Sequence, residues 1–182
     1  MTVPQKESRH LLPGLAAELL TRKRADQEAW HRFARSKEHE DALSGSAIDR
    51  DNTAWLKMVV GQHGWPGVDL VGEEGADAAW LIAQHADHDA AFQRRALELV
   101  THAALAGLVP AILYVYLTDR VRVAQGRPQL YGTQYHDDGT GTGIMAYPIE
   151  DPKRLDERRT ALGLEPHAKT ASEGQGGWVN EG

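Results

Sequence analysis

The chain has 182 residues, of which 41% are hydrophobic and 25% are charged. These values are close to those of an average soluble domain, and they exclude wholesale disorder, a collagen-like repeat and a coiled coil. The 26 acidic residues outnumber the 20 basic ones, which gives a net charge of −6 and argues against a general nucleic-acid-binding protein. The absence of cysteine excludes disulfide scaffolds, cysteine–zinc sites, iron–sulfur clusters and thiol catalysis.

The N-terminal residues carry Pro4 and several charges where a signal peptide would have an apolar segment. The longest apolar run, 103–116, is interrupted by Gly107 and Pro110. It falls short of the roughly 20 apolar residues that a helix needs to span a bilayer. We therefore expect a cytoplasmic protein with no membrane partner.

Four segments predict helices. Apolar residues recur with helical spacing over 11–39, and a second helix is expected over 51–63. Between them, the small and polar segment 43–48 predicts a loop or linker. Residues 76–86 are almost entirely apolar, which is typical of a buried helix, and a further helix is expected over 90–106.

The sequence pattern then changes. Residues 112–123 are rich in β-branched and aromatic side chains and predict a strand, with 129–135 as the returning strand. A third short strand is expected at 144–149, and a short extended piece at 68–71. Asp151 and Pro152 are typical of a helix N-terminus, so a last helix is expected over 151–163.

The expected fold class is α+β: a mainly helical single domain with a small antiparallel sheet, its hairpin at about 112–135. Residues 1–50 would form an N-terminal helix and linker packed on a core domain of residues 51–166. Residues 167–182 are polar and glycine-rich, which predicts a flexible tail.

Four polar segments interrupt otherwise apolar structure, at 84–89, 119–120, 131–134 and 158–159. A charge inside an apolar element must be paired, neutralised or turned toward a cavity. We therefore expect these segments to share one polar pocket.

His85 is the candidate general acid or base, because an imidazole with a pKa of about 6.5 exchanges protons near neutral pH. Asp119, on this hypothesis, orients His85, while Tyr131 and Gln134 donate hydrogen bonds to an oxygen that gains charge. The alternative for Asp119 is a structural bond to a turn or helix end.

Arginine pairs well with carboxylate and phosphate groups, so the substrate is expected to be a small anionic molecule. The alternative for Arg158 and Arg159 is that both are helix-surface charges. The candidate substrate-binding residues are Gln84, Arg120, Thr133, Arg158, Arg159 and Trp65.

His85, His88 and Asp89 would share one helix face and could bind zinc, iron or manganese. The spacing matches no established zinc-protease motif. The simpler alternative is that Asp87 or Asp89 caps the next helix. No cofactor is required by the sequence, and a divalent transition metal remains the alternative.

A resemblance is carried by short motifs that occur in a fixed order. These are Gly64-Trp65-Pro66, Gln84-His85-Ala86-Asp87, Asp119-Arg120, Tyr131-Gly132-Thr133-Gln134, and Arg158-Arg159 followed by Leu162-Gly163-Leu164. Over residues 51–166 the chain resembles a bacterial family of unknown function. The resemblance implies a mainly helical domain with a small sheet, and it implies no catalytic roles.

The leading hypothesis is a small-molecule enzyme that uses acid/base chemistry centred on His85, with hydrolase, lyase, isomerase and cyclase reactions not distinguished. One alternative is a metalloenzyme with a site at His85, His88 and Asp89. The other is a non-catalytic module that binds a ligand or a partner.

Overall fold

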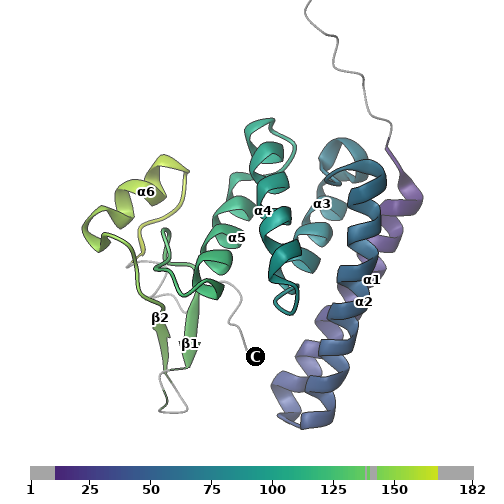
Figure 1. The fold of residues 1–182 in the computed structure, drawn as a ribbon, viewed down its shortest axis with the longest axis horizontal. Helices are drawn as coiled ribbons and strands as arrows, with labels where there is room; N and C mark the ends of the chain where they lie inside the picture. Colours follow the sequence, from purple (N-terminus) through teal and green to yellow (C-terminus); the bar gives the residue numbers. More distant parts are fainter. Residues whose placement is uncertain (1–10, 138, 140–142, 168–182) are drawn as a thin grey trace, which may run out of the picture. The chain divides into compact units, whose positions relative to one another are not determined.

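The structure is a computed structural model that describes residues 11–137, 139 and 143–167. Within these residues it contains six α-helices, one short 3₁₀ helix and a two-stranded antiparallel sheet (Figure 1). The predicted mainly helical α+β class is therefore confirmed. The first of two compact units comprises the described residues up to His85 together with 102–109, and the second comprises 86–101 and the described residues from Pro110 onward.

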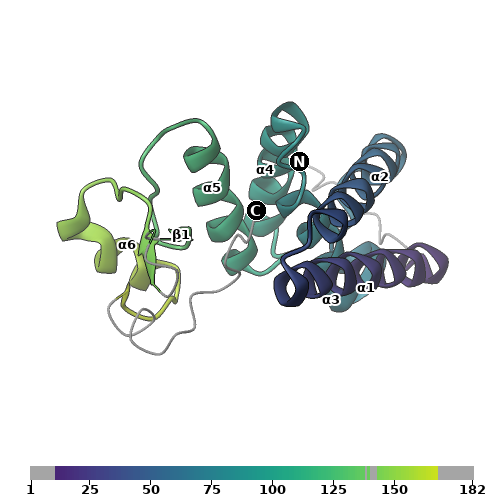
Figure 2. The same cartoon turned by 90° about the horizontal axis from the view of Figure 1, so that it is seen from below.

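The first unit is built from helices α1 (Pro13–Ser36), α2 (His39–His63) and α3 (Val68–Gln84), which pack against one another (Figure 2). Helix α1 confirms the helix predicted over 11–39 and begins with proline in its first turn, where no backbone donor is lost. Leu19, Ala29 and Leu56 are fully buried. These side chains form part of the apolar interior of the unit.

The predicted loop at 43–48 is wrong, because α2 runs through it without interruption. A domain boundary at residue 50 would accordingly fall inside a helix. Gly45 explains why this low-propensity segment is helical: a Cβ atom there would lie 3.1 Å from the Trp30 ring of α1. Close packing of a large aromatic side chain against this glycine outweighs the weak intrinsic helix propensity of glycine and serine.

Helix α3 bends at Gly72, where φ is 73°. Residues 68–71 form a helical turn before this bend, so the extended piece predicted there is wrong. Glycine is suited to this left-handed conformation because it has no Cβ atom. Residues 78–84 of α3 are all buried, in agreement with the buried helix predicted over 76–86, and the helix ends at Gln84 with His85 as its C-cap.

In the second unit, residues 112–123 form most of helix α5 (Ala111–Ala124), so the strand predicted there is wrong. Leu113, Leu117 and Val121 are all buried at intervals of four residues, which is the helical period. Burial along this face outweighs the local preference of β-branched and aromatic residues for strands. Helix α4 (Ala90–Leu105) precedes α5, and its last residues, from His102, belong to the first unit.

The hairpin consists of β1 (Tyr135–Asp137) and β2 (Ile144–Ala146), with Tyr135 opposite Ala146. It follows the predicted position of about 112–135 and overlaps it only at Tyr135. The returning strand predicted at 129–135 is wrong for 129–134, which form a loop with one bridge between Gln129 and Ile149. The loop between the strands includes residues 138 and 140–142, which lie outside the described residues, as do 168–182.

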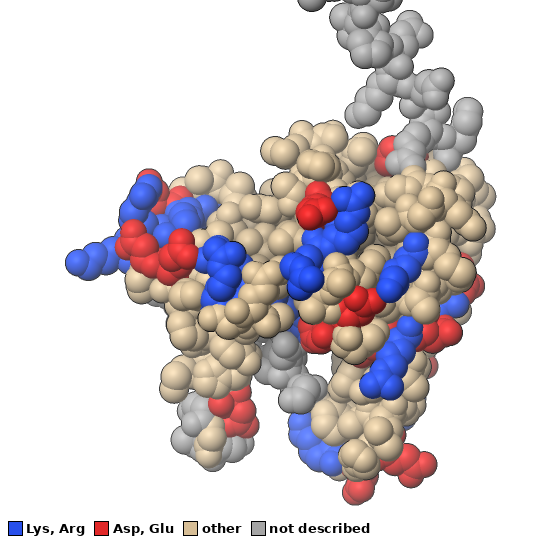
Figure 3. Space-filling view, in the orientation of Figure 1, with Lys and Arg blue, Asp and Glu red and all other residues tan. Residues whose placement is uncertain are grey.

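The last elements are the 3₁₀ helix η1 (Pro152–Arg154) and helix α6 (Leu155–Ala161), close to the predicted helix. Arg154 and Glu157 form an ion pair on their surface. On the face shown in Figure 3, acidic and basic side chains are interspersed and do not form one basic patch. No helix among the described residues is long and apolar enough to cross a membrane.

Candidate functional site

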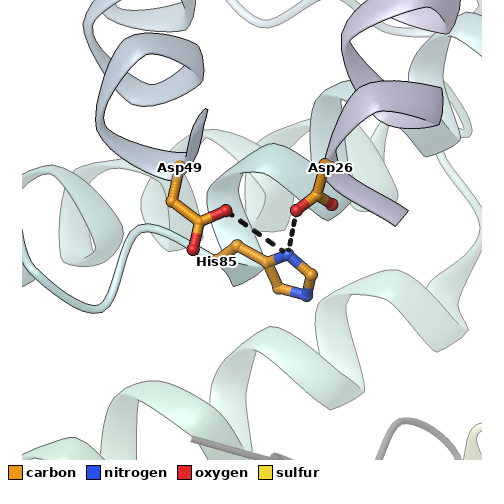
Figure 4. Close-up of side chains that lie close together, drawn as sticks. All are labelled: Asp26, Asp49 and His85. Carbon is orange, nitrogen blue, oxygen red and sulfur yellow. Dashed lines mark hydrogen bonds and ion pairs between the residues drawn. The ribbon is translucent and has the colours of Figure 1, made fainter. Parts of the chain in front are cut away.

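Each helix of the first unit brings one ionisable residue to a common point (Figure 4). Asp26 lies on α1, Asp49 on α2, and His85 caps α3. The Nδ1 atom of His85 is 2.8 Å from Oδ1 of Asp26 and 3.9 Å from Oδ1 of Asp49. We call these three residues the Asp–Asp–His cluster.

Both carboxyl groups of the cluster are buried. Asp26 is 1% exposed and Asp49 is 8% exposed, while the His85 side chain is 22% exposed. The second oxygen of Asp26, Oδ2, is buried and has no hydrogen-bond partner among the described residues. Among the described residues, no lysine or arginine forms an ion pair with either carboxyl group. The basic side chain next to both of them is that of His85. Buried carboxylates are unstable unless they are paired or protonated.

Burial raises the pKa of Asp49 from 3.8 to about 7. His85 lowers this pKa, the carboxyl group of Asp26 raises it, and a hydrogen bond from Trp30 lowers it again. The rise shows that desolvation outweighs the attraction of the imidazole for the ionised form. Asp49 therefore holds its proton more tightly than an exposed aspartate does, because its ionised form is poorly solvated.

Trp30 supports the cluster from α1, one helical turn after Asp26. Its indole Nε1 donates a hydrogen bond to Oδ1 of Asp49 at 3.2 Å, and its ring meets the His85 ring edge-on at a centroid distance of 6.4 Å. The space for this ring comes from Gly45 on α2. Trp30 thus restricts the positions of both Asp49 and His85.

The other nitrogen of His85, Nε2, has no described partner. Figure 4 shows it on the edge of the ring that faces away from both carboxyl groups. Nδ1 is held by Asp26, and the His85 side chain as a whole is 22% exposed. A carboxylate that anchors one imidazole nitrogen and leaves the other available is a recurrent arrangement for proton transfer.

Asp26 and Asp49 were not among the residues identified from the sequence. A signal for them does exist, because Asp26 lies seven residues after buried Leu19 and three before buried Ala29, within the apolar stripe of α1. Asp49 likewise lies seven residues before buried Leu56 on α2. A carboxylate inside an apolar stripe needs a partner, and this requirement could have singled out both residues.

Asp119 lies in the second unit and is fully buried. Its carboxylate accepts hydrogen bonds from the backbone N–H groups of Leu130, Tyr131 and Thr133 and from the Thr133 hydroxyl. This is the bond to a turn that the sequence left open as an alternative. The carboxylate bonded to Nδ1 of His85 is that of Asp26 and not that of Asp119.

Other predicted residues join Asp119 in ordering the loop 129–134. The side-chain amide of Gln134 donates to the Thr133 hydroxyl, and its backbone N–H donates to Gln129. The Tyr131 carbonyl accepts a hydrogen bond from Arg159. The four polar segments thus do contribute to networks, but the loop residues and His85 belong to different units.

The three arginines predicted to bind an anion make contacts within the second unit. Arg120 forms a two-bond pair with the carboxylate of Asp87. Arg158 donates to the carbonyls of Leu130 and Glu150, and Arg159 donates to that of Glu165 as well as to Tyr131. The remaining two candidates, Trp65 and Gln84, are buried in the first unit, with Gln84 directly before His85.

The predicted metal site at His85, His88 and Asp89 depends on a helix that the structure does not contain there. Helix α3 ends at Gln84, so these residues do not share a helix face. Asp89 instead accepts a hydrogen bond from the backbone of Phe92 and caps α4. Among the described residues, the group with metal-ligating geometry is the Asp–Asp–His cluster, whose ligand atoms all lie within 4.8 Å of one another.

Fold and site together define a mainly helical α+β protein with a buried Asp–Asp–His cluster between three helices. The chain belongs to the family described as "Family of unknown function (DUF6624)", whose model matches residues 13–172. The match includes α1 and α2, which supply Asp26 and Asp49. Neither a search of curated proteins nor a search of solved structures found a match.

Proposed function

We propose that this chain is a small-molecule enzyme that uses acid/base chemistry at His85. The observation that carries the proposal is the 2.8 Å contact between Nδ1 of His85 and the buried carboxyl group of Asp26, which leaves Nε2 without a described partner. A carboxylate in this position favours the tautomer with the proton on Nδ1. The lone pair is then on Nε2, where it can accept a proton from a bound molecule.

The chemistry follows from this tautomer. Nε2 takes a proton from the substrate, and the positive charge on the ring is stabilised by Asp26. Nε2 then returns the proton to the product or to a leaving group. Hydrolysis, elimination, isomerisation and cyclisation all use such a transfer. The prediction of an anionic substrate gains no support from this site, whose charged neighbours are carboxyl groups.

The test is a turnover screen against a panel of small metabolites, with products separated by liquid chromatography and identified by mass spectrometry so that isomers are also detected. His85→Gln should lower any turnover at least about 100-fold, the usual contribution of a general acid or base. His31→Gln is the matched control, since His31 is an exposed histidine on α1. Full turnover by a folded His85→Gln protein would refute the proposal.

Two further readouts sharpen the screen. Asp26→Asn should shift the pH profile of the turnover and lower its rate, because an amide cannot hold the same imidazole tautomer. Imidazole ¹⁵N spectra of the unliganded protein should show the His85 proton on Nδ1 near neutral pH. Ligands that bind tightly without turnover across the panel would favour the non-catalytic binding module instead.

A further inference from the structure

The Asp–Asp–His cluster carries more negative than positive charge when its groups ionise. Two carboxyl groups, 1% and 8% exposed, face a single imidazole nitrogen, and no described lysine or arginine pairs with them. Like charges in a water-poor site are stable together only when a proton or a cation lies between them. A bound cation would neutralise both carboxylates at once.

An unsatisfied polar atom points in the same direction. Oδ2 of Asp26 is buried and has no hydrogen-bond partner among the described residues, although its sister oxygen contacts His85. Thr53 lies one helical turn after Asp49 on α2. Its hydroxyl group is also buried and has no hydrogen-bond partner among the described residues. Buried polar atoms without partners are uncommon in native proteins and call for a specific explanation.

The distances between the ligand atoms are close to those expected around a single ion. Two ligand atoms at about 2.1 Å from one metal ion are separated by about 3.0 Å at a right angle and about 4.2 Å when opposite. The His85 nitrogen is 2.8 Å and 3.9 Å from the two carboxylate oxygens, and all ligand atoms lie within 4.8 Å of one another. Small side-chain adjustments would therefore bring all three groups onto one ion.

We propose that Asp26, Asp49 and His85 bind one divalent transition-metal ion. One imidazole nitrogen and two carboxylate oxygens, in a chain without cysteine, suit Mn²⁺, Fe²⁺ or Zn²⁺. Three protein ligands leave at least one coordination position for water or a small molecule, as in catalytic rather than structural metal sites. Trp30 orients one ligand through its hydrogen bond to Asp49, as outer groups of metal sites commonly do.

This proposal is tested separately from the acid/base role of His85, although one imidazole ring cannot play both roles at once. A metal ion on Nδ1 takes the place of the proton shared with Asp26, and the neutral ring then carries its proton on Nε2, so the catalytic proposal concerns the metal-free protein. Metal binding is measured without a substrate, so a failed turnover screen leaves it intact. Conversely, a protein that binds no metal can still use His85 as a base.

The experiment uses the full chain, purified without a histidine tag and stripped with a chelator. Titration with Zn²⁺ and Mn²⁺ in a calorimeter should give one strong site per chain. At a free ion concentration 100 times Kd, the Tm should rise by at least about 5 °C. Titration with Co²⁺ should give visible absorption bands typical of nitrogen and oxygen ligands.

The variants separate this cluster from surface histidines. His85→Gln and Asp49→Asn should each weaken binding at least about 100-fold and abolish the cobalt bands. His31→Gln and Asp51→Asn, which change exposed residues of α1 and α2, should leave both unchanged. If a ligand variant does not fold, Trp30→Phe keeps all three ligands and should weaken binding by about 10-fold. Less than a tenth of an equivalent bound, or equal affinity in the ligand variants, would overturn the proposal.

Discussion

Replacing Asp49 with asparagine removes one buried charge while preserving the shape of the side chain. The asparagine oxygen can still accept the hydrogen bond from Trp30, and its amide can donate to Asp26. Burial raises the pKa of Asp49 from 3.8 to about 7. Since one pKa unit is worth about 1.4 kcal/mol, ionisation of Asp49 costs the folded state about 4 kcal/mol relative to the unfolded chain. This free energy is an upper value, because the carboxylates of Asp26 and Asp49 can move apart when both are ionised.

The sign of the pH dependence follows from the direction of the shift. A carboxyl group with a raised pKa binds its proton more tightly in the folded state. Its stabilising contribution is complete below about pH 4 and is lost as the pH rises through about 7. The metal-free Asp49→Asn variant does not lose this contribution. Its free energy of unfolding should therefore exceed that of the wild-type protein by the largest amount at pH 8, and the difference should shrink toward pH 4.

Thermal unfolding of chelator-treated protein, followed by circular dichroism at pH 8 and pH 4.5, measures this difference. A chain of this size changes its Tm by about 2–4 °C per kcal/mol, so the upper value corresponds to about 8–16 °C at pH 8. Asp51→Asn is the control, because Asp51 lies on the same helix with its side chain 74% exposed. A variant less stable than wild type at pH 8, or a difference that does not change with pH, would refute the reasoning.

Two substitutions test the structure around the cluster and the loop. Gly45→Ala would place a Cβ atom 3.1 Å from the Trp30 ring and should destabilise the protein by about 1–3 kcal/mol in denaturant unfolding. Gly61→Ala on the same helix, with nothing within 4 Å of its Cβ, should be neutral or slightly stabilising, and equal effects at both glycines would contradict the packing argument. Asp119→Asn would turn amide N–H groups toward the backbone donors of the loop and should lower the free energy of unfolding by about 2–4 kcal/mol. The changes in backbone NMR shifts should be concentrated at Leu130, Tyr131 and Thr133. An unchanged spectrum of the loop would show that Asp119 does not hold it.

Local patterns were sufficient for the long helices and failed where burial opposed local preference. The apolar periodicity of 11–39 and the continuous apolar run of 76–86 each predict a helix that the structure contains. Residues 112–123 have the composition of a strand, yet they form α5, because Leu113, Leu117 and Val121 bury one helical face. The segment 43–48 has the composition of a loop, yet Trp30 packs against Gly45 and the helix continues.

The candidate site was predicted in part. His85 stood out because a polar group follows a buried helix, and Asp119 had the structural alternative that its hydrogen bonds to the loop now describe. Asp26 resembles the surrounding charges of α1, and 59 residues separate it from His85. The pairing of two such distant groups depends on which helix faces meet, and a local pattern carries little information about that choice.

The sequence by itself determined the mainly helical character of the chain, the start of α1 at a proline and the absence of any thiol chemistry. These properties depend on nearest neighbours and composition, which a single chain displays directly. Only the tertiary structure decided that Asp26, Asp49 and His85 meet and that the two carboxyl groups lose their contact with water. The reason is physical: the packing of three helices sets both the distances between these groups and the desolvation that gives them their chemistry.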